Sequence, residues 1–173
     1  MTEKKPLHVL VLCTGNSCRS VLGEALINHL GMGRLRASSA GSHPIGRINP
    51  NALATLARHG LPTEGYESQS WDEFGDMDID VMISVCDSAT GETCPVYLGN
   101  AVRGHWGLPD PAHSAGTAEE IEAAFEATYA ALEQRIRKLL ALPFETLSGA
   151  ELSAALNRIG EETPGGSRQI KPS

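Results

Sequence analysis

The 173-residue sequence is poor in cysteine, in aromatic side chains and in positive charge. Four cysteines are too few for a disulfide scaffold in a chain of this length, so a reducing compartment and catalytic or metal-binding thiols are expected. The 14 Lys and Arg against 21 Asp and Glu give a net charge of −7, which argues against nucleic-acid or anionic-membrane binding. No apolar run approaches the roughly 18 residues of a membrane span. We expect a cytoplasmic protein without nucleic-acid or membrane partners.

Hydrophobic residues make up 41% of the chain, which is enough for the core of one domain. Short apolar runs of strand length occupy residues 7–12, 35–40, 79–85 and 102–106. The first run follows two lysines and imitates a signal peptide, but it is short and lacks a cleavage-type ending. A buried strand of a parallel sheet explains it better.

Helical spacing of apolar residues alternates with these runs, over residues 21–30, 50–60 and 117–140. Capping boxes begin at Thr117 and Ser148, and the second precedes a short helix. We therefore expect an α/β sandwich with a parallel sheet of about four strands and helices on both faces. The expected organisation is a domain over 1–142, a helical extension over 143–160 and a disordered tail over 161–173.

The segment between the first strand and the first helix predicts an oxyanion site. Backbone N–H groups of a tight loop and the positive end of a helix bind anions, and a glycine lets the backbone approach. Arg19 can donate two hydrogen bonds to a tetrahedral anion, and the same field favours the thiolate of Cys13, a nucleophile. The Ser20 hydroxyl can hold that sulfur. The expected anion loop consists of Thr14, Gly15, Asn16, Ser17, Cys18 and Arg19.

This segment has two other interpretations. It could be an ordinary strand-to-helix turn, although the arginine six positions after Cys13 argues for the anion site. A zinc site using Cys13 and Cys18 lacks a second pair of ligands at suitable spacing nearby. Cys18 is expected to be structural.

The pattern Cys-x5-Arg-Ser after the first strand, with Asp110-Pro111 late in the chain, resembles the low-molecular-weight tyrosine phosphatase family. The stretch Cys-Thr-Gly-Asn-Ser-Cys-Arg-Ser is more similar to the arsenate reductases built on that fold. The resemblance extends over residues 7–140 and includes Asn49-Pro50 and His105-Trp-Gly. It implies a three-layer sandwich of that family.

Cys86 and Cys94 distinguish the two activities, because a hydrolytic phosphatase needs neither thiol. The resemblance implies that Cys13 attacks arsenate and that Asp110 protonates the departing oxygen. Cys86 then attacks the Cys13 sulfur and releases arsenite, and Cys94 forms a disulfide with Cys86. An external dithiol reduces that disulfide: thioredoxin is the expected donor, and glutaredoxin with glutathione or another thiol is the alternative.

No tightly bound cofactor is expected. In some relatives Asn, Glu, Ser and Asp side chains hold a potassium ion beside the anion loop. The matching positions are Asn16, Glu24, Ser39 and Asp72. Glu24 fits a solvated helix face equally well.

Two other functions stay open. A phosphatase acting on phosphotyrosine or a small phosphate ester would use only Cys13, Arg19 and Asp110. A redox or metal sensor would use the cysteines to detect oxidation or metal without catalytic turnover. Taken alone, Cys86 and Cys94 also fit buried small hydrophobic residues, or zinc ligands together with His105. Together with the Cys13 loop, the two later cysteines favour the reductase.

Overall fold

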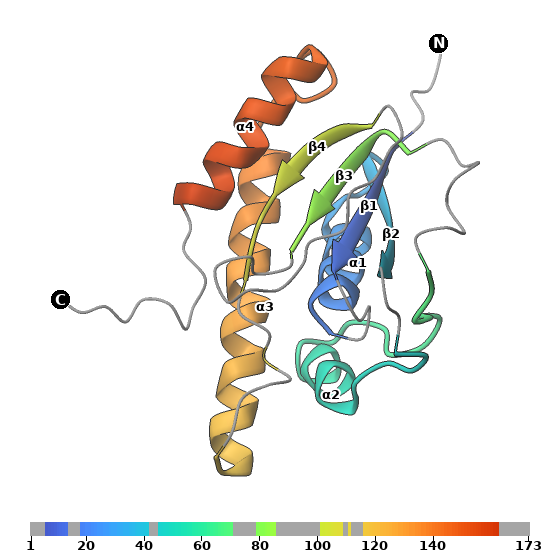
Figure 1. Cartoon of the computed structure of the whole chain (residues 1–173), viewed down its shortest axis with the longest axis vertical. Coiled ribbons are helices and arrows are strands. Elements are labelled where there is room, and N and C mark those ends of the chain that lie inside the picture. The colour runs from blue at the N-terminus through green and yellow to red at the C-terminus, as the bar shows by residue number, and fades with distance from the viewer. Residues whose placement is uncertain are drawn as a thin grey trace, which may run out of the picture.

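The computed structural model describes residues 6–13, 18–41, 45–70, 79–85, 101–108, 111 and 116–162. Its strands are β1 (Leu7–Cys13), β2 (Leu35–Gly41), β3 (Val81–Ser84) and β4 (Val102–His105). They form a parallel sheet in the order β2-β1-β3-β4 (Figure 1). The helices are α1 (Arg19–Leu30), α2 (Pro50–Arg58), α3 (Ala118–Leu140) and α4 (Gly149–Glu162). The predicted α/β class and four-stranded parallel sheet are confirmed.

The start of α1 differs from the sequence pattern in a way that matters for the site. The apolar repeat begins at Val21, whereas the helix begins two residues earlier, at Arg19. Arg19 and Ser20 therefore belong to the first helical turn, and both are buried. The N-terminus of α1 thus orients two of the predicted site residues.

The ends of the other helices follow local chemistry. Helix α2 ends before Gly60, whose φ of 76° is left-handed and stops a helix. Both expected capping boxes form: Thr117 and Glu120 exchange side-chain and backbone hydrogen bonds at the start of α3, and Ser148 and Glu151 do so at α4. Helix α4 continues two residues beyond the expected end at 160.

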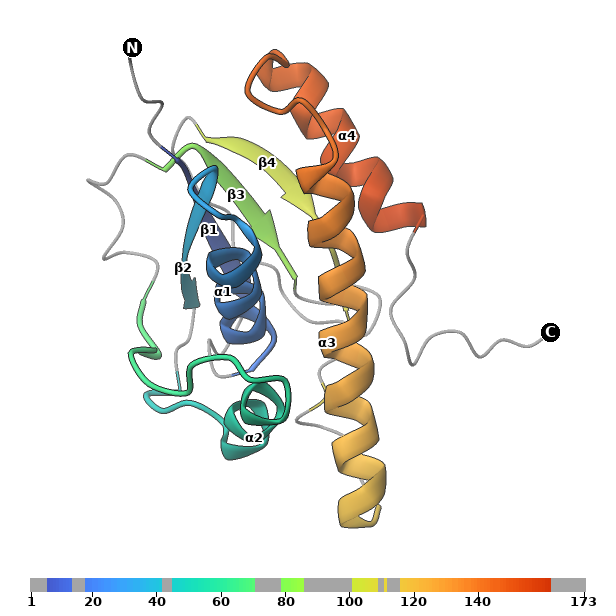
Figure 2. The same cartoon turned by 180° about the vertical axis from the view of Figure 1, so that it is seen from behind.

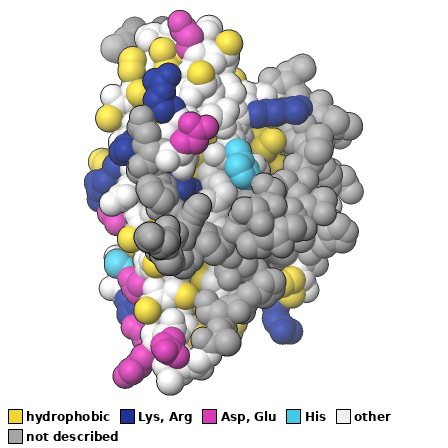
Figure 3. Space-filling model, turned by 60° about the vertical axis from the view of Figure 1, so that its left-hand side comes forward, with side chains coloured by type: hydrophobic (Ala, Val, Ile, Leu, Met, Phe, Trp, Pro, Cys, Tyr) yellow, Lys and Arg dark blue, Asp and Glu magenta, His cyan; other side chains and the backbone are white. Residues whose placement is uncertain are grey.

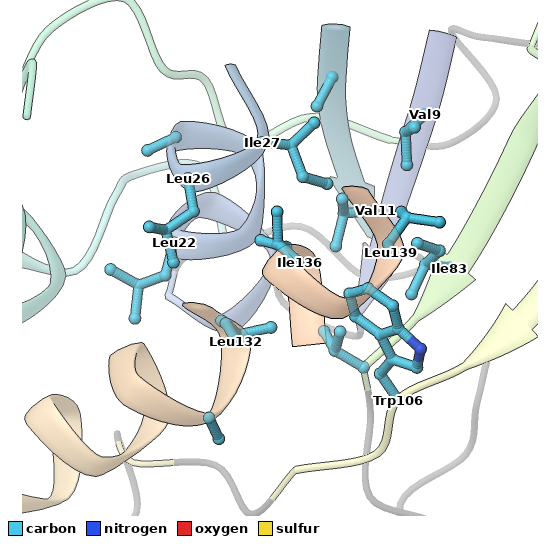
Figure 4. Packing of buried hydrophobic residues seen from close by; sticks show 14 of the residues in the cluster. Val9, Val11, Leu22, Leu26, Ile27, Ile83, Trp106, Leu132, Ile136 and Leu139 are labelled. Atoms are coloured by element: carbon cyan, nitrogen blue, oxygen red, sulfur yellow. The ribbon is translucent and has the colours of Figure 1, made fainter. Parts of the chain in front are cut away.

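The main core lies between the sheet and helices α1 and α3 (Figures 2 and 4). Side chains alternate along β1, so Val9 and Val11 face this core, where Leu22 of α1 and Ile136 of α3 also lie. Gly23 lets α1 approach the sheet, because a Cβ there would be 3.2 Å from Cγ1 of Val11. This close packing fixes α1 relative to β1.

The opposite face of the sheet carries a second, smaller buried cluster of Leu10, Leu12, Ala40 and Met82. The described helices pack against the first face and against β4 (Figures 1 and 2). Among the described residues, the partly buried Ile79 and Ala101 pack against this second cluster. None of the described helices combines the length and the apolar character that a bilayer crossing requires.

Helix α4 packs against β4, the last strand of the sheet. Its apolar residues Leu152, Leu156 and Ile159 are buried in the main core. On the face shown in Figure 3, the described hydrophobic side chains are scattered among charged ones of both signs. The apolar side chains of α4 therefore pack inside the protein.

Candidate active site

Cys13 is the last residue of β1, and α1 begins six residues later. It lies beside Gly41 of β2 in the register of the sheet and is buried. Ligands of open α/β sheets bind beyond the carboxyl ends of the strands. The structure thus places Cys13 at the edge where the sequence predicts it.

Ser20 holds the Cys13 sulfur. The Cys13 thiol donates a hydrogen bond to the Ser20 hydroxyl, with the sulfur and oxygen 3.0 Å apart. A hydroxyl both donates and accepts, so it can turn its proton toward the sulfur when Cys13 ionises. Both groups are buried, and a hydrogen bond to a charged sulfur is stronger there than in water.

Arg19 is only 2% exposed and is anchored by backbone carbonyls. Its Nη1 donates to the carbonyl oxygen of Leu108 at 3.0 Å and to that of Val85 at 3.4 Å. A guanidinium carries five N–H donors, so one nitrogen can be fixed by the backbone while the group still binds a tetrahedral anion. The two carbonyls therefore set the direction of the side chain.

These contacts bring three parts of the chain together at the carboxyl edge. The Val85 N–H donates to the Leu12 carbonyl at 2.8 Å, and the Leu108 N–H donates to the Val85 carbonyl at 3.1 Å. Leu12 precedes Cys13, Val85 precedes the predicted thiol at position 86, and Leu108 lies two residues before the predicted acid at 110. Backbone hydrogen bonds at this edge thus connect the segments that precede Cys13, Cys86 and Asp110 in the sequence.

Many predicted site residues lie outside the described residues. These are Thr14, Gly15, Asn16, Ser17, Asp72, Cys86, Cys94 and Asp110. The roles given to them stay predictions. Cys18 is described: it is buried in the main core directly before α1.

Glu24 and Ser39, two of the four positions matched to a potassium site, are in contact. The Ser39 hydroxyl of β2 donates to Oε1 of Glu24 on α1 at 2.6 Å. Burial raises the pKa of Glu24 to about 7; the hydrogen bond from Ser39 opposes this shift, and the nearby Glu67 adds to it. Glu24 is therefore not on a freely solvated helix face.

A pocket of about 460 Å³ borders Glu24. Asn28 and His29 of α1 line it, together with Glu64 and Tyr66 from the segment after α2. A half-buried carboxylate beside a polar pocket is a favourable place for a cation, because the cation offsets the desolvation of the charge.

The zinc alternative pairs His105 with the two later cysteines. Nδ1 of His105 is 2.7 Å from the hydroxyl oxygen of Ser84, the residue beside it on β3. Within the described ranges, no three His, Cys, Asp or Glu side chains are grouped so as to hold a metal ion. Cys86 and Cys94, the other residues of the zinc alternative, lie outside the described ranges, so that alternative stays a prediction.

The buried Cys13 at the end of β1 and the buried Arg19 at the start of α1 define an α/β protein with a candidate active site at the carboxyl edge of its parallel sheet. The family model described as low molecular weight phosphotyrosine protein phosphatase matches residues 8–154, and the chain belongs to this family.

Arsenate reductases are among the proteins to which the chain is similar. The chain is 34% identical over 137 residues to the arsenate reductase of Bacillus licheniformis, which covers 79% of this chain and 95% of that protein. The crystal structure of arsenate reductase from Archaeoglobus fulgidus superposes with a TM-score of 0.65 at 28% identity, over 78% of this chain and 99% of that one. An arsenate reductase in the phosphate binding state gives 0.62 at 26% identity, over 78% and 97%.

Proposed function

We propose that this protein is an arsenate reductase whose nucleophile is Cys13. The observation that carries the proposal is the grouping of Cys13, Ser20 and Arg19 at the carboxyl edge of the sheet. The similarity to arsenate reductases over more than three quarters of the chain supports the same activity. Two further cysteines, 86 and 94, follow β3 in the sequence and supply the thiols that a reductase needs.

In the first step, the Cys13 thiolate attacks the arsenic of arsenate, and an S–As bond replaces an As–O bond. Asp110 donates the proton with which the displaced oxygen leaves as water or hydroxide. Arsenic stays in the +5 state. Arg19 binds the remaining oxygens, and Ser20 donates to the sulfur before attack.

In the second step, the Cys86 thiolate attacks the Cys13 sulfur. The electron pair of the S–As bond passes to arsenic, which leaves as arsenite in the +3 state, and a Cys13–Cys86 disulfide forms. Cys94 then attacks Cys86, which frees Cys13 and leaves a Cys86–Cys94 disulfide. An external dithiol returns both electrons; we propose thioredoxin, with glutaredoxin and glutathione or another thiol as the alternative donor. Such a donor implies the cytoplasm.

Potassium fits the Glu24 and Ser39 pair. Their oxygens are hard ligands, and Glu24 is a half-buried carboxylate that a cation would stabilise in its charged form. Together with Asn16 and Asp72 they would hold the ion, which supplies a fixed positive charge beside the anion loop. No reaction step depends on it.

A phosphatase that uses Cys13, Arg19 and Asp110 is the second candidate, because the matching family model is described by that activity. A single pair of assays separates the two functions: arsenite formation with thioredoxin and its reductase, and hydrolysis of an aryl phosphate. A reductase forms arsenite in a donor-dependent way. Rapid aryl phosphate hydrolysis without arsenite formation would favour the phosphatase.

A further inference from the structure

Two buried arginines hold the segment that leads from β4 to the predicted acid loop. Arg19 of α1 donates to the Leu108 carbonyl, as described above. Arg135 of α3 donates through Nη1 to the Trp106 carbonyl at 2.8 Å and to the Gly107 carbonyl at 3.4 Å. Three successive carbonyls, 106 to 108, thus accept from guanidinium groups of two different helices.

Arg135 also reaches α4. Its Nη2 is 3.4 Å from the carbonyl oxygen of Gly160, in the last turn of the helix, where the partial negative charge of the helix end favours a cation. The side chain is 1% exposed, so these carbonyls accept hydrogen bonds that water would otherwise accept. Arg135 therefore ties α3 and α4 to the backbone of residues 106 and 107.

Hydrogen bonds between side chains and backbone groups hold α4 against β4 and the following Trp106. Oδ1 of Asn157 accepts from the His105 N–H at 2.9 Å, and the Ser153 hydroxyl donates to the Arg103 carbonyl at 2.6 Å. The indole Nε1 of Trp106 donates to a backbone carbonyl of α4, that of Leu156, at 2.9 Å. The helix lies close beside its partners, as Figures 1 and 2 show.

The approach is closest at Gly160. A Cβ at this position would be 2.6 Å from the His105 carbonyl oxygen and 3.0 Å from Cδ1 of Trp106. Only a glycine permits the last turn of α4 to reach Arg135 at this distance from the strand. The contact is therefore sensitive to a single methyl group.

We propose that Arg135 is a positioning residue of the oxyanion site, and that α4 supports it in this role. By fixing the carbonyls of Trp106 and Gly107, Arg135 fixes the next carbonyl, that of Leu108, and through it the guanidinium of Arg19. The inference deepens the proposed function and rests on it, because it assigns a role in binding the same anion.

The variant that tests the inference is Arg135→Gln in the full-length protein. Inorganic phosphate is the probe, because it binds without being reduced. Its affinity is measured by how it protects Cys13 from iodoacetamide, quantified by mass spectrometry of the Cys13 peptide. We expect affinity to fall at least about tenfold, since a misplacement of about 1 Å in a binding site can cost about 10²-fold.

Arg34→Gln is the matched control. Arg34 donates to the carbonyls of Leu140 and Leu142, so its loss also removes guanidinium–backbone bonds, but it lies next to the start of β2, at the opposite edge of the sheet. We expect this variant to lose stability and to keep its affinity for phosphate. A purely structural Arg135 would behave in the same way.

Gly160→Ala is the second variant, and it leaves residue 135 as arginine. We expect its methyl group to push the last turn of α4 from His105 and to weaken phosphate binding in the same direction. It also decides the matter if Arg135→Gln fails to fold.

The outcomes separate the inference from the proposed function. Phosphate that protects wild-type Cys13 and both variants equally would overturn the role of Arg135 and leave the proposed function standing. Phosphate that does not protect even wild-type Cys13 would overturn the oxyanion site, and the role of Arg135 with it. Weakened protection in Arg135→Gln, with Arg34→Gln unchanged, supports the inference, and wild-type protection in a folded Arg135→Gln overturns it. If Arg135→Gln does not fold, Gly160→Ala decides by the same criterion.

Discussion

Arg19 and Leu108 are 89 residues apart in the chain and are joined by a hydrogen bond of 3.0 Å. The bond connects the first turn of α1 with the segment after β4. Because Arg19 is buried, its direction depends on these backbone partners as much as on the helix that carries it. Arg19, the last residue of the expected anion loop, is therefore tied to a segment that is distant from it in the sequence.

Replacing Arg19 should disable anion binding. Loss of one preorganised donor to a developing oxyanion reduces turnover by about 10²–10³-fold, and Arg19→Ala removes a forked donor. Arg19→Lys keeps a charge without the fork and should recover only part of the activity. Arsenite formation measures the effect, with Arg137→Ala as the control, because Arg137 is exposed and pairs with Glu133 on the surface. Equal activity of Arg19→Ala and the control would remove Arg19 from the mechanism.

Ser20→Ala should slow the reaction of Cys13. Without the hydroxyl the ionised sulfur loses a buried hydrogen bond, so alkylation of Cys13 at neutral pH and arsenite formation should both fall about tenfold, roughly 1.4 kcal/mol. Ser38→Ala is the matched control, because that hydroxyl lies 2.9 Å from Nε2 of His8, away from Cys13. If both variants react at the wild-type rate, Ser20 does not activate the sulfur.

Glu24 should make stability depend on pH. Its pKa rises from 4.5 to about 7 on folding, so between these values the native state binds more protons than the unfolded state. Its contribution is fully present below about pH 4.5, is lost as the pH rises through 7, and amounts to at most about 3 kcal/mol. Glu24→Gln should show a flatter pH profile in urea unfolding from pH 5 to 8. Parallel profiles for the two proteins would contradict this account.

Potassium should offset the loss of stability that ionisation of Glu24 causes at high pH. A cation that binds only the native state stabilises it, so KCl should raise stability at pH 8 above that in NaCl of the same concentration. The difference should disappear in Glu24→Gln and persist in Glu64→Gln, which alters an exposed carboxylate of the same pocket. A wild-type protein that is equally stable in both salts has no potassium site at Glu24.

The sequence predicts most of the architecture because its signals are local. Strand-length apolar runs and capping boxes each involve neighbouring residues, and the spacing of Cys13 and Arg19 lies within one loop. The hydrogen bond from Arg19 to the Leu108 carbonyl could not be predicted from the sequence. Every residue has a carbonyl group, and only the folded chain determines which one lies beside Arg19.

Arg135 did leave a signal in the sequence. It lies three residues after Leu132 and four before Leu139, on the buried stripe of α3. A charged residue on an apolar stripe needs polar partners in the core, so its position alone indicates a structural or functional task. The partners themselves, Trp106 and Gly160, come from elements that only the folded chain brings together.

The central claim, a relay through three cysteines, is tested most directly by mass spectrometry of the fully reduced protein after one equivalent of arsenate. The wild-type protein should carry a Cys86–Cys94 disulfide, and Cys94→Ser should be trapped with a Cys13–Cys86 disulfide. Cys18→Ser should behave as wild type. A Cys13–Cys18 bond as the only disulfide in both the wild type and Cys94→Ser would contradict the relay.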